Sequence, residues 1–322
     1  MKVPLRNLGS WKVSAMGLGG MPLSGMPAEK AAILDDREGA IGVIHAALDA
    51  GITLIDTADI YSPSWNTFGH NERLVGEAFR TWRGSHEAKS KVVIASKGGI
   101  TRGPKESWGR CGEKDYFLRA AEASALRLGV EKIQLWQHHR LDPSMPFETQ
   151  FENVLVLLER GIVERIGVSN YNAEQLRRAV KIGGTPDQGG VISIQNEFSP
   201  HYRLESEVHK VCEEFGIAFL AYSPFSGVNS SKLLGEGSYG DFAAVGATRN
   251  VSAYAIGIAW LLKVSPTIIP IPGATRIASV IDSLSGAAIE LTDEEMDRIN
   301  ASLPANPPID GDLVNQPPFL EK

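Results

Sequence analysis

The first predicted strand ends in the stretch Gly17-Leu18-Gly19-Gly20-Met21-Pro22. This stretch distinguishes between two fold classes in which strands and helices alternate. A doubly wound open sheet usually has a G-x-G-x-x-G turn at this point, and a helix begins directly from it. The stretch lacks that motif and carries Pro22 where the helix would open. It therefore favours a closed (β/α)8 barrel, or TIM barrel, over the open sheet.

Short apolar, β-branched runs alternate with segments of helical spacing along the rest of the chain. The predicted strands are residues 13–19, 53–57, 92–97, 133–139, 163–169, 192–197, 218–223 and 267–271. The predicted helices are residues 38–50, 71–82, 116–128, 147–160, 173–182, 205–215, 253–264 and one that begins near Ile277. Eight strand–helix pairs are the number that a barrel needs, so we expect residues 1–322 to form one domain.

Three segments lie outside this alternation. The long connection between Gly19 and Glu38 is expected to lie over one mouth of the barrel. Residues 225–242 are rich in Gly and Ser, and they are predicted to be either a mobile flap or an ordinary surface loop. The chain after Asn300 is rich in Pro, and residues 304–322 are expected to form a tail on the surface.

The composition argues against several classes of protein. Of the 322 residues, 43% are hydrophobic and 22% are charged, close to the average of soluble globular proteins. The formal net charge of -6, without a run of Lys and Arg, leaves no electrostatic footprint for nucleic acid. Cys111 and Cys212 lie far apart, which argues against a zinc site or a disulfide scaffold. The sequence contains neither a signal core nor a membrane span, so we expect a cytoplasmic protein.

Three adjacent predicted strands end in polar side chains. The second strand runs into Asp56 and then Tyr61, the third ends at Lys97, and the fourth ends at His138 and His139. In a barrel, the C-terminal ends of the strands and the loops after them carry the catalytic residues. We therefore expect a carboxylate, a phenol, an ammonium group and an imidazole to meet at one face.

These groups suit proton transfer to a carbonyl oxygen. A tyrosine loses its proton near pH 10, and it acts as a general acid near neutrality only when its phenolate is stabilised. The ammonium group of Lys97 would stabilise a phenolate, and Asp56 would offset the cost of burying that Lys. A neutral His could orient the carbonyl oxygen. Each residue also has a structural interpretation, with Lys97 and Asp56 as a satisfied ion pair and Tyr61 as a loop aromatic.

The later strand ends supply a second group of polar residues, namely Ser169, Asn170, Gln195, Tyr222, Ser223 and Pro224. Their amides and hydroxyls suit a carboxamide ligand, and Tyr222 offers a flat face for a ring. After the eighth strand, Gly273 permits close backbone approach and Arg276 could clamp a phosphate at a helix N-terminus. In the alternative interpretation, Asn170 caps a helix, Gln195 is a core amide and Arg276 is a surface residue.

Taken in order, these motifs resemble those of the aldo-keto reductase family, from Leu8-Gly9 to about Leu303. The matching stretches are Asp56-Thr57-Ala58-Asp59-Ile60-Tyr61, Lys97, His139-Arg140-Leu141-Asp142-Pro143, Gly167-Val168-Ser169-Asn170, Gln195-Asn196-Glu197, Ala221-Tyr222-Ser223-Pro224 and Pro270-Ile271-Pro272-Gly273. The resemblance is to microbial members, in the branch related to potassium-channel β subunits. It implies a TIM barrel that reduces an aldehyde or ketone with a hydride from NADPH.

The resemblance also implies residue roles. Tyr61 donates a proton to the carbonyl oxygen, Lys97 lowers the pKa of Tyr61, Asp56 supports Lys97, and His139 positions the oxygen. His139 is preferred to His138 because it matches the family's histidine, and because neighbours on a strand face opposite ways. The implied cofactor contacts are Ser169, Asn170, Gln195, Tyr222, Ser223, Pro224, Gly273, Arg276, Ser279, Asp282 and Ser283.

Among these contacts, Arg276 is implied for the 2′-phosphate of NADPH, Asp282 and Ser283 are implied for the adenine, and Ser279 stands where some members carry an Arg. Residues 225–242 would then cover the pyrophosphate if they form a flap. An apolar substrate pocket is expected from four aromatic residues, Trp65, Phe68, Trp136 and Phe225. The expected partner is a small carbonyl compound, and neither its identity nor the oligomeric state is specified by the sequence.

Other functions remain as alternatives. A nicotinamide-binding regulatory subunit with little turnover is the second hypothesis, since intact catalytic residues do not exclude it. A metal-dependent barrel enzyme is disfavoured because no His/Asp cluster has ligand spacing. A retaining glycosidase would need paired acids, and only Asp56 and Glu197 stand at strand ends.

Overall fold

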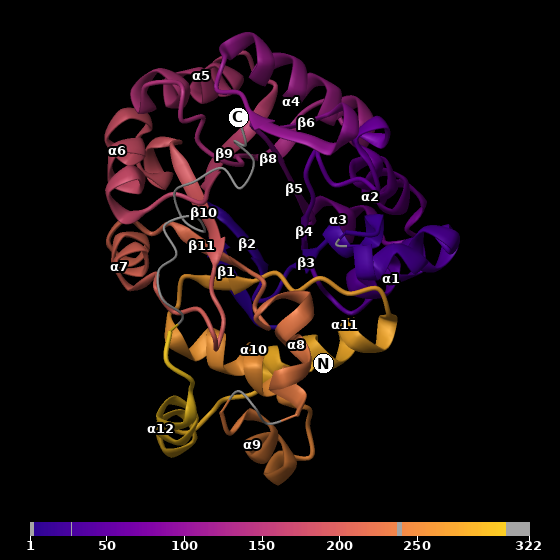
Figure 1. Ribbon diagram of the computed structural model, residues 1–322, viewed down its shortest axis with the longest axis vertical. Helices are drawn as coiled ribbons and strands as arrows, with labels where there is room; N and C mark the ends of the chain where they lie inside the picture. Colours follow the sequence, from indigo (N-terminus) through magenta and orange to yellow (C-terminus); the bar gives the residue numbers. More distant parts are fainter. Residues whose placement is uncertain (1–2, 27, 237–239, 307–322) are drawn as a thin grey trace.

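Eight parallel strands form the central sheet of the computed structural model, which describes residues 3–26, 28–236 and 240–306. They are β3 (Leu18–Gly19), β4 (Leu54–Asp56), β5 (Val93–Gly98), β8 (Ile133–His138), β9 (Val163–Ser169), β10 (Val191–Glu197), β11 (Ala218–Tyr222) and β12 (Ile268–Pro270). Backbone hydrogen bonds from Gly17 N to Pro270 O (2.9 Å) and from Gly19 N to Pro272 O (3.0 Å) join the two outermost strands. The sheet is thereby closed, which confirms the predicted (β/α)8 barrel (Figure 1).

Helices surround the barrel (Figure 1). The eight predicted helices are α1 (Arg37–Asp49), α2 (His70–Thr81), α4 (Lys114–Leu128), α5 (Phe147–Glu159), α6 (Ala173–Gly183), α7 (Ser206–Phe215), α10 (Ala253–Val264) and α11 (Ile277–Ser285). Helix α6 illustrates why they form where predicted. Asn172 caps its first turn in a capping box with Gln175, and its apolar side buries Leu176 and Val180. The structure also contains α3 (His86–Ser90), α8 (Gly227–Gly235), α9 (Phe242–Arg249) and α12 (Asp293–Ser302).

The first predicted strand, residues 13–19, is wrong as a single element. Its start belongs to an antiparallel hairpin of β1 (Leu5–Leu8) and β2 (Trp11–Ser14), and only β3 joins the barrel. Leu8 and Val13 of the hairpin pack with barrel-interior residues such as Leu54 and Leu135. The apolar run therefore serves two elements, one that closes the bottom of the barrel and one that forms its wall.

The connections at the other end of the barrel contain elements that the sequence did not suggest. The segment after β3 forms short 3-10 helices, η1 (Met21–Ser24) and η2 (Ala28–Asp35). A hairpin of β6 (Ile100–Gly103) and β7 (Ser107–Arg110) follows β5. It lies against η3 (Trp65–Thr67), the short helix in the connection after β4. These connections frame the end of the barrel where the polar strand ends meet.

One segment prediction needs correction. Residues 225–242 are not simply a loop, because they contain α8, while residues 237–239 lie outside the described residues. Helix α12 ends at Ser302, just before the predicted tail of residues 304–322. At its start, Arg203 donates to Pro304 O (2.6 Å), and residues 307–322 lie outside the described residues. Among the described helices, none has the length and apolar character to cross a membrane.

Candidate active site

A buried ion pair lies at the C-terminal ends of β4 and β5. The Nζ atom of Lys97 is 2.7 Å from Asp56 Oδ2 and donates a second hydrogen bond to Thr57 O at 2.8 Å. Burial alone lowers the pKa of Lys97, but the charge of Asp56 and the neighbouring Tyr61 outweigh it, so the pKa is raised. Lys97 therefore keeps its positive charge although its side chain is inaccessible to solvent.

The second carboxylate oxygen of Asp56 is held from across the barrel. Gln195 of β10 donates from Nε2 to Asp56 Oδ1 at 2.7 Å, and Gln137 of β8 donates to the same oxygen at 3.4 Å. Three strands thus fix the orientation of Asp56. The sequence analysis missed Gln137, although it stands two residues before His139 and so shares its strand face.

Tyr61 stands above this ion pair. Lys97 Nζ is 4.8 Å from the centre of the Tyr61 ring. Burial raises the pKa of Tyr61, and the positive charge of Lys97 opposes that rise. The loop that carries Tyr61 is tied to α2, because Asn71 N donates to Tyr61 O at 3.0 Å. The phenol is consequently fixed beside an ammonium group, with 9% of the residue exposed.

Of the two candidate histidines, His139 faces Tyr61. The two rings meet edge to face with their centroids 6.0 Å apart. Burial and then the charge of Lys97 lower the pKa of His139 well below its usual value, so the imidazole is neutral. His138 instead turns to the helix layer, where its Nδ1 lies 2.7 Å from Tyr171 Oη and its ring packs on Phe117.

Asn170 joins the ends of β8, β9 and β11. Its Nδ2 donates to His139 O at 3.1 Å and to Ser169 Oγ at 2.9 Å, and Tyr222 Oη donates to its Oδ1 at 2.9 Å. Its backbone has a φ of 58°, a left-handed conformation that Asn tolerates. Asn172 and not Asn170 caps α6, which removes the capping interpretation of Asn170. The amide lies instead at the mouth of the barrel.

The ends of β11 and β12 shape the far side of the mouth. Ser223 has a φ of 49° in the turn after β11, and Pro224 is buried beside it. Gly273 approaches η1 so closely that an added Cβ would stand 2.6 Å from Pro22 Cγ, so a side chain is disfavoured there. Arg276 is exposed at the start of α11, where no side chain caps the helix.

The weaker cofactor candidates on α11 differ in exposure. Ser279 is half-buried in the first turn, and Ser283 is buried one turn further on. Asp282 accepts a hydrogen bond from Ser252 Oγ at 2.6 Å. Ser279 is thus nearer to the uncapped helix start than the other two.

The four aromatic residues predicted for the substrate pocket separate into two pairs. Phe68 packs in a small cluster with Tyr61, and Trp65 is 39% exposed at the start of η3. Trp136 was wrongly predicted. Trp136 points out of the barrel, is fully buried and packs on Phe117, because successive residues of β8 face opposite sides. Phe225 packs on Tyr254 of α10.

Two apolar residues near Tyr61 were missed by the sequence analysis. Met21 of η1 and Trp108 of β7 pack against the same small cluster. Both stand in connections whose path depends on tertiary contacts, so no local periodicity marks them. Over the described part of the chain, no group of three His, Cys, Asp or Glu residues could hold a metal ion.

Comparison with known proteins assigns a family to this barrel. The family model described as "Aldo/keto reductase family" matches residues 15–304. The chain belongs to the aldo/keto reductase family. An uncharacterized oxidoreductase of Schizosaccharomyces pombe is 30% identical over 290 residues, which are 89% of this chain and 86% of that protein. A probable aldo-keto reductase 1 of Glycine max is 28% identical, over 91% of this chain and 86% of that protein.

The solved structures agree with this aldo/keto reductase fold. An aldo/keto reductase from Klebsiella pneumoniae, in complex with NADP and acetate, superposes with a TM-score of 0.75 at 23% identity. The match covers 96% of this chain and 97% of that one. As a member of the aldo/keto reductase family, the protein is an oxidoreductase.

Proposed function

We propose that the protein is an NADPH-dependent carbonyl reductase that acts on an aldehyde or ketone, with Tyr61 as the general acid. The observation that carries the proposal is the buried Lys97 ammonium group between Asp56 and Tyr61. A charged Lys this deep is costly unless it is paired, and here it also lies against a phenol ring. Such an arrangement favours a tyrosine that gives up a proton.

The described residues fit a nicotinamide dinucleotide. Phosphate would lie at the start of α11, where the helix is uncapped and Arg276 is exposed. Asn170, Ser169 and Tyr222 stand beside His139 and suit the carboxamide and the ring. The Klebsiella pneumoniae relative was solved with NADP, and another structure of an aldo-keto reductase from that organism contains NADPH. Bound NADPH would supply the hydride that adds to the carbonyl carbon.

The residues of the chain would handle the oxygen and its proton. Neutral His139 would donate a hydrogen bond to the carbonyl oxygen and orient it towards Tyr61. As negative charge develops on that oxygen, Tyr61 would transfer its phenolic proton to it. Lys97 would stabilise the phenolate that remains, and Asp56 would hold Lys97 in place. The products would be an alcohol and the oxidised nucleotide.

The test is NADPH oxidation, followed at 340 nm with a panel of aldehydes, for wild type and Tyr61→Phe. We expect the kcat of the variant to fall at least ~100-fold, because removal of a general acid typically costs that much. The Kd for NADPH, measured by fluorescence titration, should stay within about twofold, since the hydroxyl is not a proposed cofactor contact. Tight NADPH binding without turnover of any aldehyde would instead favour the regulatory subunit.

We also propose a reducing, cytoplasmic location. Cys111 and Cys212 are both free thiols, which agrees with such a compartment. Fluorescence microscopy of a tagged chain, with retention of both thiols after cell lysis under alkylating conditions, tests this location.

A further inference from the structure

The side chain of Glu205 does not stabilise the helix that it precedes. Glu205 is the N-cap residue of α7, where an acidic side chain is favoured by the free backbone N–H groups of the first turn. Within the described residues, its carboxylate forms no capping hydrogen bond. The residue is instead buried, with 7% exposed, and Oε2 accepts a hydrogen bond from Asn196 Nδ2 at 2.9 Å. Burying a carboxylate is costly, so its contact with Asn196 calls for a role other than capping.

Asn196 connects Glu205 to Asn170. The Nδ2 atom of Asn196 also donates to Tyr171 O at 2.8 Å, and its Oδ1 accepts from the backbone N of Asn170 at 2.8 Å. The two acceptors on the nitrogen side, Tyr171 O and Glu205 Oε2, fix which end of the Asn196 amide faces Asn170. In the flipped orientation the amide oxygen would face two acceptors, and the amide nitrogen would face a donor.

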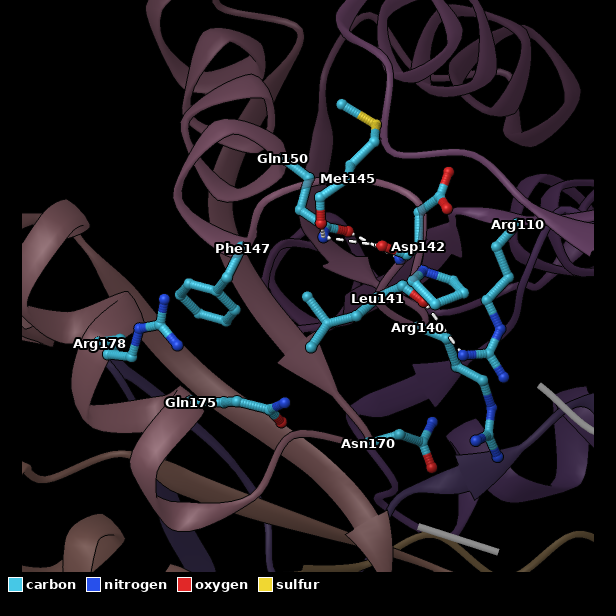
Figure 2. Close-up of a pocket in the computed structure, with 11 residues that line it drawn as sticks. Arg110, Arg140, Leu141, Asp142, Met145, Phe147, Gln150, Asn170, Gln175 and Arg178 are labelled. Atoms are coloured by element: carbon cyan, nitrogen blue, oxygen red, sulfur yellow. Dashed lines mark hydrogen bonds between the residues drawn. The ribbon is translucent and has the colours of Figure 1, made fainter. Parts of the chain in front are cut away.

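Asn170 depends on this support because its backbone has a φ of 58°, in the left-handed region. A residue other than glycine keeps such a conformation where its surroundings fix it, and here its N donates to both Asn196 Oδ1 and Gln195 O. The side chain of Asn170 then contacts the catalytic end of the barrel, through His139 O and Tyr222 Oη. Asn170 also lines a cavity of about 210 Å³ between the loops that follow β8 and β9, so it borders open space as well as this network (Figure 2).

We propose that Glu205 is a positioning residue for the nicotinamide end of the cofactor, acting through Asn196 on Asn170. The proposal rests on the proposed function, which assigns Asn170 to the carboxamide of NADPH. Glu205 itself would contact neither cofactor nor substrate. It orients the Asn196 amide, which holds the backbone of Asn170 so that the Asn170 side chain is placed for the carboxamide.

The property that this role requires of Glu205 is an acceptor oxygen. Burial raises the pKa of Glu205 to about 7, so its carboxyl group is partly protonated at neutral pH. Both forms keep an oxygen that can accept from Asn196 Nδ2. Glutamine at this position would keep such an oxygen as well, whereas alanine would not.

Nucleotide binding tests this role without turnover. The Kd values for NADPH and for adenosine 2′,5′-bisphosphate, the adenine half of NADP, would be measured calorimetrically for wild type, Glu205→Ala, Glu205→Gln and Glu207→Ala. Glu207 is the matched control, because it is an exposed acid in the first turn of the same helix and pairs with Lys210.

We expect Glu205→Ala to raise the Kd for NADPH at least ~5-fold, about the worth of one hydrogen bond. Glu205→Gln should stay within about twofold of wild type, because it keeps the acceptor, and Glu207→Ala should not change the Kd. Binding of the bisphosphate should be the same in all four proteins, since the adenine half of the cofactor would lie at the start of α11.

Two further variants locate the effect. Asn196→Ala breaks the same connection at its other end and should weaken NADPH binding in the same way, so the test also stands if Glu205→Ala folds poorly. Asn170→Ala removes the residue through which Glu205 acts. The double variant Asn170→Ala/Glu205→Ala should therefore bind NADPH within about twofold of Asn170→Ala alone. The thermal transition of each variant verifies that it is folded.

The role of Glu205 and the proposed function fail in different ways. An unchanged Kd for NADPH in folded Glu205→Ala or Asn196→Ala, or equal weakening of NADPH and the bisphosphate, would overturn the role of Glu205. Multiplying losses in the double variant would do the same, because Glu205 would then act independently of Asn170. In each of these cases, aldehyde reduction by wild type leaves the proposed function standing. A wild type that binds no NADPH would overturn the proposed function, and the role of Glu205 with it.

Discussion

Lys97 connects the groups of the candidate site through both charge and geometry. Its ammonium group pairs with Asp56, approaches the ring of Tyr61 and lowers the pKa of His139. The same charge therefore opposes the rise that burial causes in the pKa of Tyr61, and it adds to the fall that burial causes in the pKa of His139. Removing it should alter stability as well as chemistry, because Asp56 would remain buried without its cation.

The residue-scale prediction is a double-mutant cycle of Asp56→Asn and Lys97→Met. Each single variant should lose about 3 kcal/mol of unfolding free energy, because breaking a buried pair leaves one uncompensated charge. The double variant removes both charges, so its loss should be smaller than the sum of the single losses by about 2 kcal/mol. Urea denaturation of the four proteins measures this coupling.

The activity of the same variants separates stability from chemistry. Lys97→Met and the double variant should both lose at least ~100-fold in kcat, since Tyr61 then lacks the stabilising charge. Additive losses of stability, within about 0.5 kcal/mol, would show that the two residues do not couple and would contradict the prediction.

At the scale of elements, strand periodicity predicted most of the barrel. The run 163–169 coincides with β9, and the Asp56, Lys97 and His139 strand ends converge because parallel strands end at one face. Trp136 shows what a list of aromatic residues misses, since its position on β8 points it towards the helices. Strand alternation, which had favoured His139 over His138, would also have excluded Trp136.

The sequence could not predict elements that depend on distant contacts. The β6–β7 hairpin has short strands with few apolar residues, and its stability comes from contacts with the loop after Tyr61. Likewise, residues 13–19 carry one polar side chain, that of Ser14, and show no alternation, so their division between β2 and β3 follows from packing and not from periodicity. The role of Gln137 follows only from the structure, in which its amide donates a hydrogen bond to Asp56 Oδ1.

The element-scale prediction concerns Arg102, which attaches the β6–β7 hairpin to the loop after Tyr61. Its guanidinium group donates to Ser62 O at 2.7 Å and lies 4.7 Å from the Trp108 ring centre. Arg102→Ala should loosen residues 62–69 and raise the KM for bulky aldehydes about fivefold, while kcat changes less than about threefold. Steady-state kinetics and hydrogen exchange of residues 62–69 measure both effects.

A matched control for Arg102 is Arg37→Ala, because Arg37 forms an exposed ion pair with Glu77 on the helices outside the mouth. That variant should change neither KM nor the exchange rates near Tyr61. A large loss of kcat in Arg102→Ala with unchanged KM would mean that the hairpin acts on the chemistry and not on the pocket wall.

At the scale of the whole molecule, buried histidines link stability to pH. His209 of α7 is packed between Phe198 and Phe219, with ring centroids 4.6 Å and 4.3 Å away. Neither of its ring nitrogens has a hydrogen-bond partner among the described residues. Burial lowers the pKa of His209 to about 4, although Glu213 opposes this shift. The folded protein therefore binds this proton less readily than the unfolded chain, whose histidine has a pKa near 6.5.

The sign of the effect follows from that difference. Between about pH 6.5 and pH 4 the unfolded state carries the extra proton, so His209 reduces the stability of the fold as the pH falls. The unfolding free energy that the protein loses through His209 is small at pH 7 and amounts to about 2 kcal/mol at pH 5. Other groups titrate in this range, with Glu205 raised to a pKa of about 7 by burial, so wild-type stability alone does not isolate His209.

The comparison of wild type with His209→Leu isolates it. Leucine has a similar volume and no polar atoms, so the variant should be more stable than wild type at pH 7 by about 1 kcal/mol, from removal of unpaired buried nitrogens. The advantage should grow by about 2 kcal/mol between pH 7 and pH 5, because the variant cannot bind the proton that favours unfolding. Urea denaturation at several pH values measures this difference, and an advantage independent of pH would show that His209 is protonated equally in both states. The ring of His209 packs in the helix layer on Phe198 and Phe219, away from Tyr61. NADPH oxidation by His209→Leu should therefore be unchanged. The pH-dependent stability that His209 causes is thus separate from the chemistry at the mouth of the barrel.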